Sequence, residues 1–415
     1  MQSLPSIAFK LLLTVLLVST AHARKPEPSR LLRTLTGTSN PAKLREIEKL
    51  ARRPKDRNAA LPDLIEAANN IADKAAQHDA ERLSESTLAL WDLIGSSNEP
   101  TATDALINLL RAEHTKVAMA SAEALGRNNR TSALVALRQQ IKRPDYASSY
   151  AFRFSLLKSI ALLRSPEAVN FLLVTLPTLD GQLKHEVTTF LSQVELIHFR
   201  GDQEKFDAWK ANIWEPLVAS GFSNAEPGTP ASYRSQHKRA TYYGMPIYAR
   251  RVVFVIDRSP SMDEMVDGQS RLRRAMRELT QVINALDPST EFSVVVFEGR
   301  VKAWQKSLGE ASHKNKLSVI KFARQHYRSG LTNTYGALRT ALNLDENTEA
   351  IYLISDGEPT TGTIQAPGEI IDDITRRNEF RYITINTVGI ALSGTAQQFM
   401  QELAEQNGGE YRDTQ

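Results

Sequence analysis

The hydrophobic pattern of the chain changes near residue 250, and this change most constrains what the chain can fold into. From about Pro41 to Leu217 the sequence is rich in alanine and leucine with a helical period. After Arg250, β-branched runs alternate with amphipathic stretches; these runs are Val252 to Ile256, Phe292 to Phe297, Ile351 to Ile354 and Tyr382 to Val388. The 415 residues suffice for two domains, and the two patterns predict two of different class.

The first pattern predicts an all-α domain over residues 41–220. Thr101 with Asp104, Thr131 and Ser165 each open an apolar segment, as residues that cap helix amino termini do. The first helices of successive units recur at intervals of 28 and 35 residues, at Ala105-Leu106, Ala133-Leu134 and Ala168-Val169. This pairing of helices resembles HEAT-type repeats, and a non-repetitive helical bundle is the alternative. Either arrangement is predicted to act as a scaffold that binds macromolecules.

The second pattern predicts a doubly wound, Rossmann-like α/β domain over residues 250–415. Nearly continuous apolar strands separated by helices are typical of a parallel sheet covered on both faces. In such sheets ligands bind at the carboxyl ends of the strands, so the loops after Ile256 and Ile354 are where a site is expected. Residues 221–249 are rich in proline, glycine and polar residues and are predicted to be a linker. Because the net charge is only +4, the basic and tyrosine residues of this linker are interpreted as solvated, and no nucleic-acid partner is predicted.

Oxygen-bearing side chains follow two of these strands. Asp257, Ser259 and Ser261 stand at alternate positions after Ile256, and Asp356 comes soon after Ile354. The loop from Gly330 to Thr334 adds further hydroxyls before a helix. Carboxylates and hydroxyls are hard ligands that suit a small hard cation, so these loops predict a magnesium site. Each residue could instead cap a helix or form a turn.

The block resembles a von Willebrand factor type A (VWA) domain with a metal-ion-dependent adhesion site, and the resemblance covers Arg250 to about Arg412. It implies that one divalent cation, Mg²⁺ or else Mn²⁺ or Ca²⁺, is surrounded by Asp257, Ser259, Ser261, Thr332 and Asp356. It also implies that an exposed glutamate or aspartate of a protein partner completes the coordination. The chain would then be an adhesion protein and not an enzyme. Bacterial members of the family are sometimes fused to helical repeats.

Two positions depart from the family's pattern. Pro260 stands where glycine is common, and its ring fixes φ and removes a backbone donor, which should disturb the loop slightly. Leu331 stands where the family often has a second glycine, and this leaves Thr334 as an alternative ligand. The family's spacing favours Thr332.

Other functions are considered beside adhesion. The helical domain could do the binding, with a VWA domain that is only structural. Phosphoryl transfer on a similar sheet, as in haloacid dehalogenase-like phosphatases, requires a second aspartate where this chain has Ser259, which removes the general acid. A metalloprotease is disfavoured because His185-Glu186 is followed by Thr189 where a second histidine is needed.

The amino-terminal residues predict export. Lys10, the apolar run Leu11 to Val18 and Ala21-His22-Ala23 are typical of a signal peptide over residues 1–23, with an uncleaved anchor as the alternative. Residues 24–40 are predicted to be a flexible N-terminus. The mature protein is expected in the periplasm or outside the cell, without stable membrane insertion. The absence of cysteine excludes disulfides and thiolate chemistry.

Overall fold

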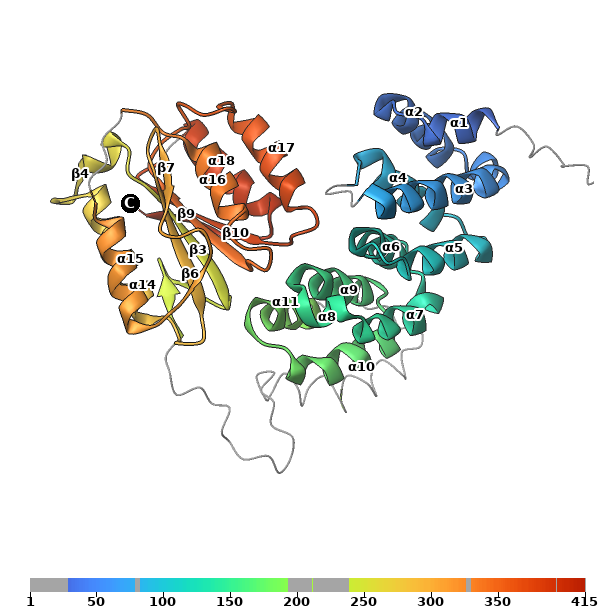
Figure 1. Ribbon diagram of the computed structural model, residues 1–415, viewed down its shortest axis with the longest axis horizontal. Coiled ribbons are helices and arrows are strands. Elements are labelled where there is room, and N and C mark those ends of the chain that lie inside the picture. The colour runs from blue at the N-terminus through green and yellow to red at the C-terminus, as the bar shows by residue number, and fades with distance from the viewer. Residues whose placement is uncertain are drawn as a thin grey trace, which may run out of the picture.

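The computed structural model describes residues 29–78, 83–192, 211, 239–325, 330–392 and 394–414, which form a helical region and an α/β domain (Figure 1). The predicted signal peptide, residues 193–210 and 212–220 of the predicted helical domain, and residues 221–238 of the predicted linker lie outside the described residues. Among the described helices, none combines the length and the apolar character that a membrane span requires.

The described residues up to Ser192 form helices and no strands, as the first hydrophobic pattern predicts. The helices follow one another in stacked layers (Figure 1). They are α1 (Arg30–Thr36), α2 (Asn40–Ala51), α3 (Pro54–His78), α4 (Glu85–Gly95), α5 (Pro100–Leu110), α6 (Thr115–Arg127), α7 (Leu134–Gln139), α8 (Pro144–Ser148), α9 (Tyr150–Leu162), α10 (Pro166–Thr175) and α11 (Gly181–Ser192). Short 3₁₀ turns lie at η1 (Thr131–Ala133), η2 (Gln140–Lys142) and η3 (Leu176–Thr178). One core of alanine, leucine and aromatic side chains runs through these layers.

The helix starts agree in part with the predicted caps. Ser165 caps α10, because its hydroxyl accepts a hydrogen bond from the amide of Ala168 at 3.2 Å. Thr131 opens the 3₁₀ turn η1 instead of an α-helix. Thr101 lies inside α5, which begins at Pro100 because proline suits the first helical position. The segment 24–40, predicted to be flexible, contains α1, whose buried Leu32 and Leu35 join the helical core.

The α/β domain is built on a seven-stranded sheet with the order β11-β10-β9-β3-β6-β7, and β8 also pairs with β6. Five strands of this sheet run parallel, as predicted: β3 (Arg251–Asp257), β6 (Glu291–Phe297), β9 (Ala350–Ser355), β10 (Thr384–Ile390) and β11 (Tyr411–Thr414). The expectation of a wholly parallel sheet is corrected at one edge, where β7 (Val301–Ala303) and β8 (Gly309–Glu310) run antiparallel to β6. The turn between β6 and β7 is too short for a parallel crossover.

Helices cover both faces of this sheet (Figure 1). Val252, Phe254 and Ile256 point to one face and pack with α14 (Arg271–Ala285) and α15 (His313–Ala323). Val253 and Val255 point to the other face and pack with α16 (Thr334–Leu342), α17 (Pro367–Asn378) and α18 (Gly394–Gln406). Alternate residues of a strand face opposite sides, so both sides of β3 must be apolar when both are covered.

Part of the predicted linker belongs to this fold. Strands β1 (Thr241–Tyr242) and β2 (Met245–Pro246) form a hairpin whose turn residues Tyr243 and Gly244 both have positive φ. The ring of Tyr242 is fully buried and lies 5.2 Å from that of Phe254, centroid to centroid. Residues 239–249 therefore pack on the sheet instead of bridging two domains.

The helical region contacts the α/β domain at the amino ends of the central strands. Tyr382, which precedes β10, stacks on Phe154 of α9 with ring centroids 4.6 Å apart. Glu349, which precedes β9, accepts hydrogen bonds from the amides of Gln182 at 3.2 Å and Arg250 at 2.8 Å. The carboxyl ends of the strands, where a site was expected, lie at the opposite edge.

Candidate metal centre

The strand order reverses direction between β3 and β9, and parallel sheets bind ligands at such a point. The chain leaves β3 towards β6 on one side, whereas β9 continues to β10 on the other. The carboxyl ends of the two paired strands lie side by side there, which is where such sheets bind ligands. Asp257 is the last residue of β3, and Asp356 directly follows Ser355, the last residue of β9. The topology therefore brings both predicted carboxylates to one place.

Four of the five predicted residues form one hydrogen-bonded cluster. The Oγ atoms of Ser259 and Ser261 are 2.9 Å apart, and Ser261 donates to Oδ1 of Asp356 at 2.8 Å. Asp257 is fully buried; its Oδ1 accepts from the amide of Ser259 at 2.8 Å and its Oδ2 from the hydroxyl of Ser355 at 2.6 Å. Two carboxylates and two hydroxyls thus converge at the strand ends.

The fifth residue, Thr332, reaches the same edge through its backbone. Its amide donates to Oγ1 of Thr360 at 2.7 Å, and its carbonyl accepts from the amide of Thr360 at 2.9 Å. The next amide, of Asn333, donates to the carbonyl of Glu298 at 2.7 Å, just beyond β6. The alternative ligand Thr334 is the first residue of α16, and its buried Oγ1 has no hydrogen-bond partner among the described residues. Both threonines remain candidates by geometry.

Burial dominates the electrostatics of the two carboxylates. Removal from water raises the pKa of Asp257 to about 6, although the hydrogen bonds from Ser355 and Ser259 oppose this rise. Burial also raises the pKa of Asp356, against the opposing hydrogen bonds from Ser261 and Arg271. Nη1 of Arg271 lies 2.9 Å from Oδ2 of Asp356. A divalent cation would favour the ionised form of both acids.

The donor set fits a small hard cation. Its atoms are oxygens of carboxylates and hydroxyls, which suit Mg²⁺, Mn²⁺ and Ca²⁺ better than soft metals. Across the part of the chain that the structure describes, no group of three or more histidine, aspartate or glutamate side chains could hold a metal. A cation in this cluster would therefore depend on hydroxyl ligands as well as on Asp257 and Asp356.

Two residues of the cluster, Ser355 and Arg271, were not predicted from the sequence. Ser355 precedes Asp356 in the sequence, so a hydroxyl at that strand end was the available signal. Arg271 contacts Asp356 and also Glu264 at 2.9 Å, and no motif marks it. Pro260 was expected to disturb the loop, but it opens the 3₁₀ turn η6 (Pro260–Asp263) at the position where proline is favoured.

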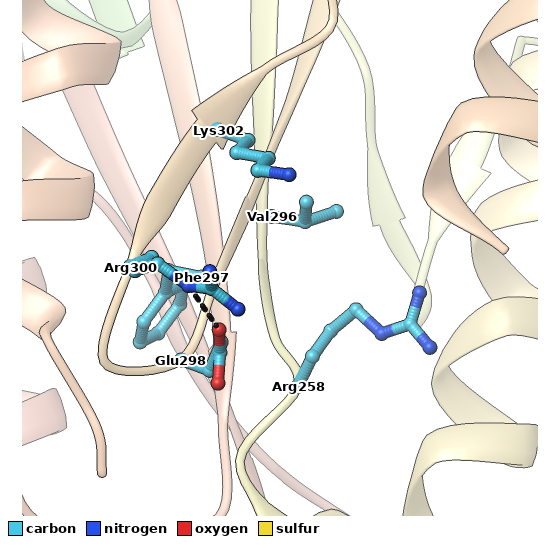
Figure 2. Close-up of a pocket in the computed structure, with 6 residues that line it drawn as sticks. All are labelled: Arg258, Val296, Phe297, Glu298, Arg300 and Lys302. Carbon is cyan, nitrogen blue, oxygen red and sulfur yellow. Dashed lines mark hydrogen bonds and ion pairs between the residues drawn. The ribbon is translucent and has the colours of Figure 1, made fainter. Parts of the chain in front are cut away.

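A small pocket lies next to the end of β6 (Figure 2). Its lining residues are Arg258, Val296, Phe297, Glu298, Arg300 and Lys302. Nε of Arg300 lies 3.2 Å from the buried carboxylate of Glu298. Figure 2 shows the guanidinium of Arg258 pointing away from this pair. The basic residues of the lining therefore do not converge on one point.

Residues 252–414 match the sequence model of the family described as von Willebrand factor type A domain. This part of the chain is therefore a VWA domain. The HEAT-like character of the helical region stays a prediction.

Similar proteins share this domain. Human von Willebrand factor A domain-containing protein 3B is 32% identical over 162 residues, 39% of this chain and 11% of that protein. Human inter-alpha-trypsin inhibitor heavy chain H4 is 23% identical over 263 residues, 59% of this chain and 27% of that protein. The chain thus spans a minor part of the length of these relatives. A solved von Willebrand factor type A structure from Catenulispora acidiphila is 17% identical with a TM-score of 0.33, covering 41% of this chain and 40% of its own.

Proposed function

We propose that the VWA domain binds a protein partner through a divalent cation, held by Asp257, Ser259, Ser261, Thr332 and Asp356. The observation that carries this proposal is the hydroxyl of Ser261, bonded to Ser259 and to Asp356 where β3 and β9 end together. Mg²⁺ takes six oxygen ligands, so these five residues would leave one position, which water would fill until a carboxylate of the partner replaces it.

The bound cation would supply the positive charge that attracts an acidic side chain of the partner. This chain's own residues prepare that charge. Asp257 is fixed by Ser355 and by the amide of Ser259, so its oxygens need little reorganisation. The serine hydroxyls are uncharged ligands, and they leave more of the cation's charge for the incoming anion than carboxylates would.

A binding role is favoured over catalysis. In a phosphoryl-transfer enzyme Asp257 would attack the substrate, and a neighbouring acid would protonate the leaving group. The position of the general acid in that reaction is held by Ser259, which titrates far outside the useful range. We therefore infer a non-enzymatic adhesion protein.

The helical region would serve as the scaffold of this module. It contacts the domain at the amino ends of the strands, through residues such as Tyr382 and Glu349. That contact leaves the carboxyl edge, with the polar cluster, available to a partner. We further propose that the protein acts in the periplasm or outside the cell, as the amino-terminal sequence suggests.

Metal binding is the first test, and thermal unfolding of the chain from residue 24 measures it. Mg²⁺ at about 100 times its dissociation constant should add roughly 2.7 kcal/mol, a rise of several degrees in Tm over EDTA. Asp257→Asn should abolish this rise, because an amide is a poorer ligand for a hard cation than a carboxylate. Asp263→Asn, at an exposed position of the same loop, should keep it.

Partner binding is the second test. Peptides or proteins with an exposed glutamate or aspartate should bind in Mg²⁺ and dissociate in EDTA. If a partner stays bound to Asp257→Asn and in EDTA but is lost when α1 to α11 are removed, the helical region does the binding and the metal proposal is wrong.

A further inference from the structure

Arg258 is a buried arginine inside the loop that carries Asp257, Ser259 and Ser261. The residue is only 9% exposed. Nη1 donates to the carbonyl of Gln325 at 2.6 Å and also to the carbonyl of Ala323, the last residue of α15. Burying an arginine is costly unless its donors are satisfied. The carbonyls of Ala323 and Gln325 supply acceptors for its Nη1.

The end of α15 is a suitable acceptor for physical reasons. The last carbonyls of a helix have no partner within the helix, and together they carry a partial negative charge. A guanidinium placed there donates hydrogen bonds to these carbonyls and also places its positive charge beside their partial negative charge. The side chain of Arg258 thus joins the strand-end loop to a helix that lies outside the cluster.

The backbone of Arg258 is fixed as well. Its amide donates to the carbonyl of Phe297 at 2.7 Å, and the next carbonyl, of Glu298, accepts from the amide of Asn333 at 2.7 Å. Two consecutive carbonyls at the end of β6 therefore hold the loop of Asp257 and the loop of Thr332. Arg258 adds a connection from the first of these loops to the end of α15.

We propose that Arg258 is a positioning residue for the metal site, which keeps the Asp257 loop in place relative to α15 and the end of β6. This inference rests on the proposed function, because it concerns the same cation. Residues that orient metal ligands through hydrogen bonds typically affect metal affinity by about 10- to 100-fold when they are removed. Arg258 makes no contribution as a ligand, since arginine has no acceptor for a cation.

Metal affinity separates positioning from simple stabilisation of the fold. The dissociation constant of Mg²⁺ is measured by calorimetry at 25 °C on variants whose circular dichroism matches that of wild type, and Mn²⁺ electron paramagnetic resonance reports bound ion independently. Arg258→Met should weaken Mg²⁺ about 10- to 100-fold. Arg258→Lys, which can reach one carbonyl, should lie between wild type and Arg258→Met. Arg273→Met removes the same charge from an exposed position on α14 and should bind Mg²⁺ as wild type does.

The outcomes distinguish the two proposals. If wild type binds Mg²⁺ and Arg258→Met binds it within twofold, Arg258 does not position the site, even where Tm in EDTA falls. If wild type and Arg273→Met bind no metal, the proposed function fails and this inference with it. Should Arg258→Met not fold, Arg258→Lys and Arg258→Gln replace it in both assays. If both variants bind Mg²⁺ and Mn²⁺ as tightly as wild type, the proposal is wrong; weaker binding supports it.

Discussion

At the scale of single residues, Thr332 and Thr334 can be distinguished by how their replacement with valine changes stability and the response to Mg²⁺. The buried Oγ1 of Thr334 has no hydrogen-bond partner among the described residues, and an unsatisfied buried hydroxyl destabilises the folded state. Thr334→Val replaces it with a methyl group of similar shape. We expect the free energy of unfolding in EDTA to rise by about 1 kcal/mol, with the Mg²⁺-dependent rise in Tm retained. Urea denaturation measures the first and thermal unfolding the second.

The matching change at the favoured ligand should behave differently. Thr332→Val should lose the Mg²⁺-dependent rise in Tm, because the hydroxyl would be a ligand of the cation. The hydrogen bonds from the backbone of Thr332 to Thr360 do not involve the side chain of Thr332, so they should persist. If Thr334→Val loses the metal effect and Thr332→Val keeps it, the ligand assignment must be exchanged.

At the scale of elements, the local hydrophobic pattern was sufficient to predict the strands whose own residues carry a clear apolar run. The apolar runs from Val252 and Ile351 became buried central strands, and the oxygen-bearing side chains after them met because parallel strands end at one edge. Contacts between distant segments could not be read from the sequence. Arg258 donates a hydrogen bond to Ala323 at the end of α15, 65 residues away in the sequence. Arg271 donates one to Asp356, 85 residues away. No local signal specifies such pairs.

The hairpin of β1 and β2 illustrates the same difference. Its proline and glycine content resembles that of a linker, yet Tyr242 is fully buried against Phe254 and Tyr352. Whether such a segment packs on the sheet depends on the shape of the sheet surface that it meets. The composition of the segment does not show that shape. The antiparallel edge strands β7 and β8 were missed because they are too short for a periodic pattern.

The hairpin should therefore contribute to stability. Tyr242→Ala should lower the free energy of unfolding by about 3 to 5 kcal/mol, the usual cost of deleting a buried aromatic ring. Tyr242→Phe is the matched control: the buried hydroxyl of Tyr242 has no hydrogen-bond partner among the described residues, so its loss should be neutral or stabilising. Urea denaturation of the three proteins tests this, and equal stability of Tyr242→Ala and wild type would exclude packing of the hairpin.

At the scale of the whole molecule, the contact between the helical region and the VWA domain contains a buried acid, Glu349, and a half-buried one, Glu186. Glu349 accepts amide hydrogen bonds from Gln182 of α11 and from Arg250 before β3. Burial raises its pKa from the usual 4.5 to about 7, and Asp180 adds to the rise, whereas those two hydrogen bonds and Arg153 oppose it. Glu186 of α11, which accepts from Thr384 of β10 at 3.5 Å, also has a raised pKa because of burial.

A raised pKa makes this contact sensitive to pH. The folded state binds the proton of Glu349 more tightly than the unfolded state, so the stability from this group is fully present below about pH 4.5. It is lost as the pH rises towards about 7, by up to about 3 kcal/mol in total. Ionisation of Glu349 would therefore weaken the attachment of α11 to the amino ends of β3 and β9.

Glu349→Gln tests this dependence, because glutamine keeps an oxygen acceptor for the two amides and cannot ionise. We expect the variant to be more stable than wild type at pH 8, with the difference shrinking or reversing towards pH 5. Urea denaturation in EDTA at pH 5, 6, 7 and 8 measures it, since EDTA removes any contribution from the metal site. Glu310→Gln, at an exposed position in β8, should follow wild type at every pH. If the curves of wild type and Glu349→Gln run parallel, the contact does not hold Glu349 away from water, and the two regions are joined less closely than the hydrogen bonds of Gln182 and Arg250 indicate.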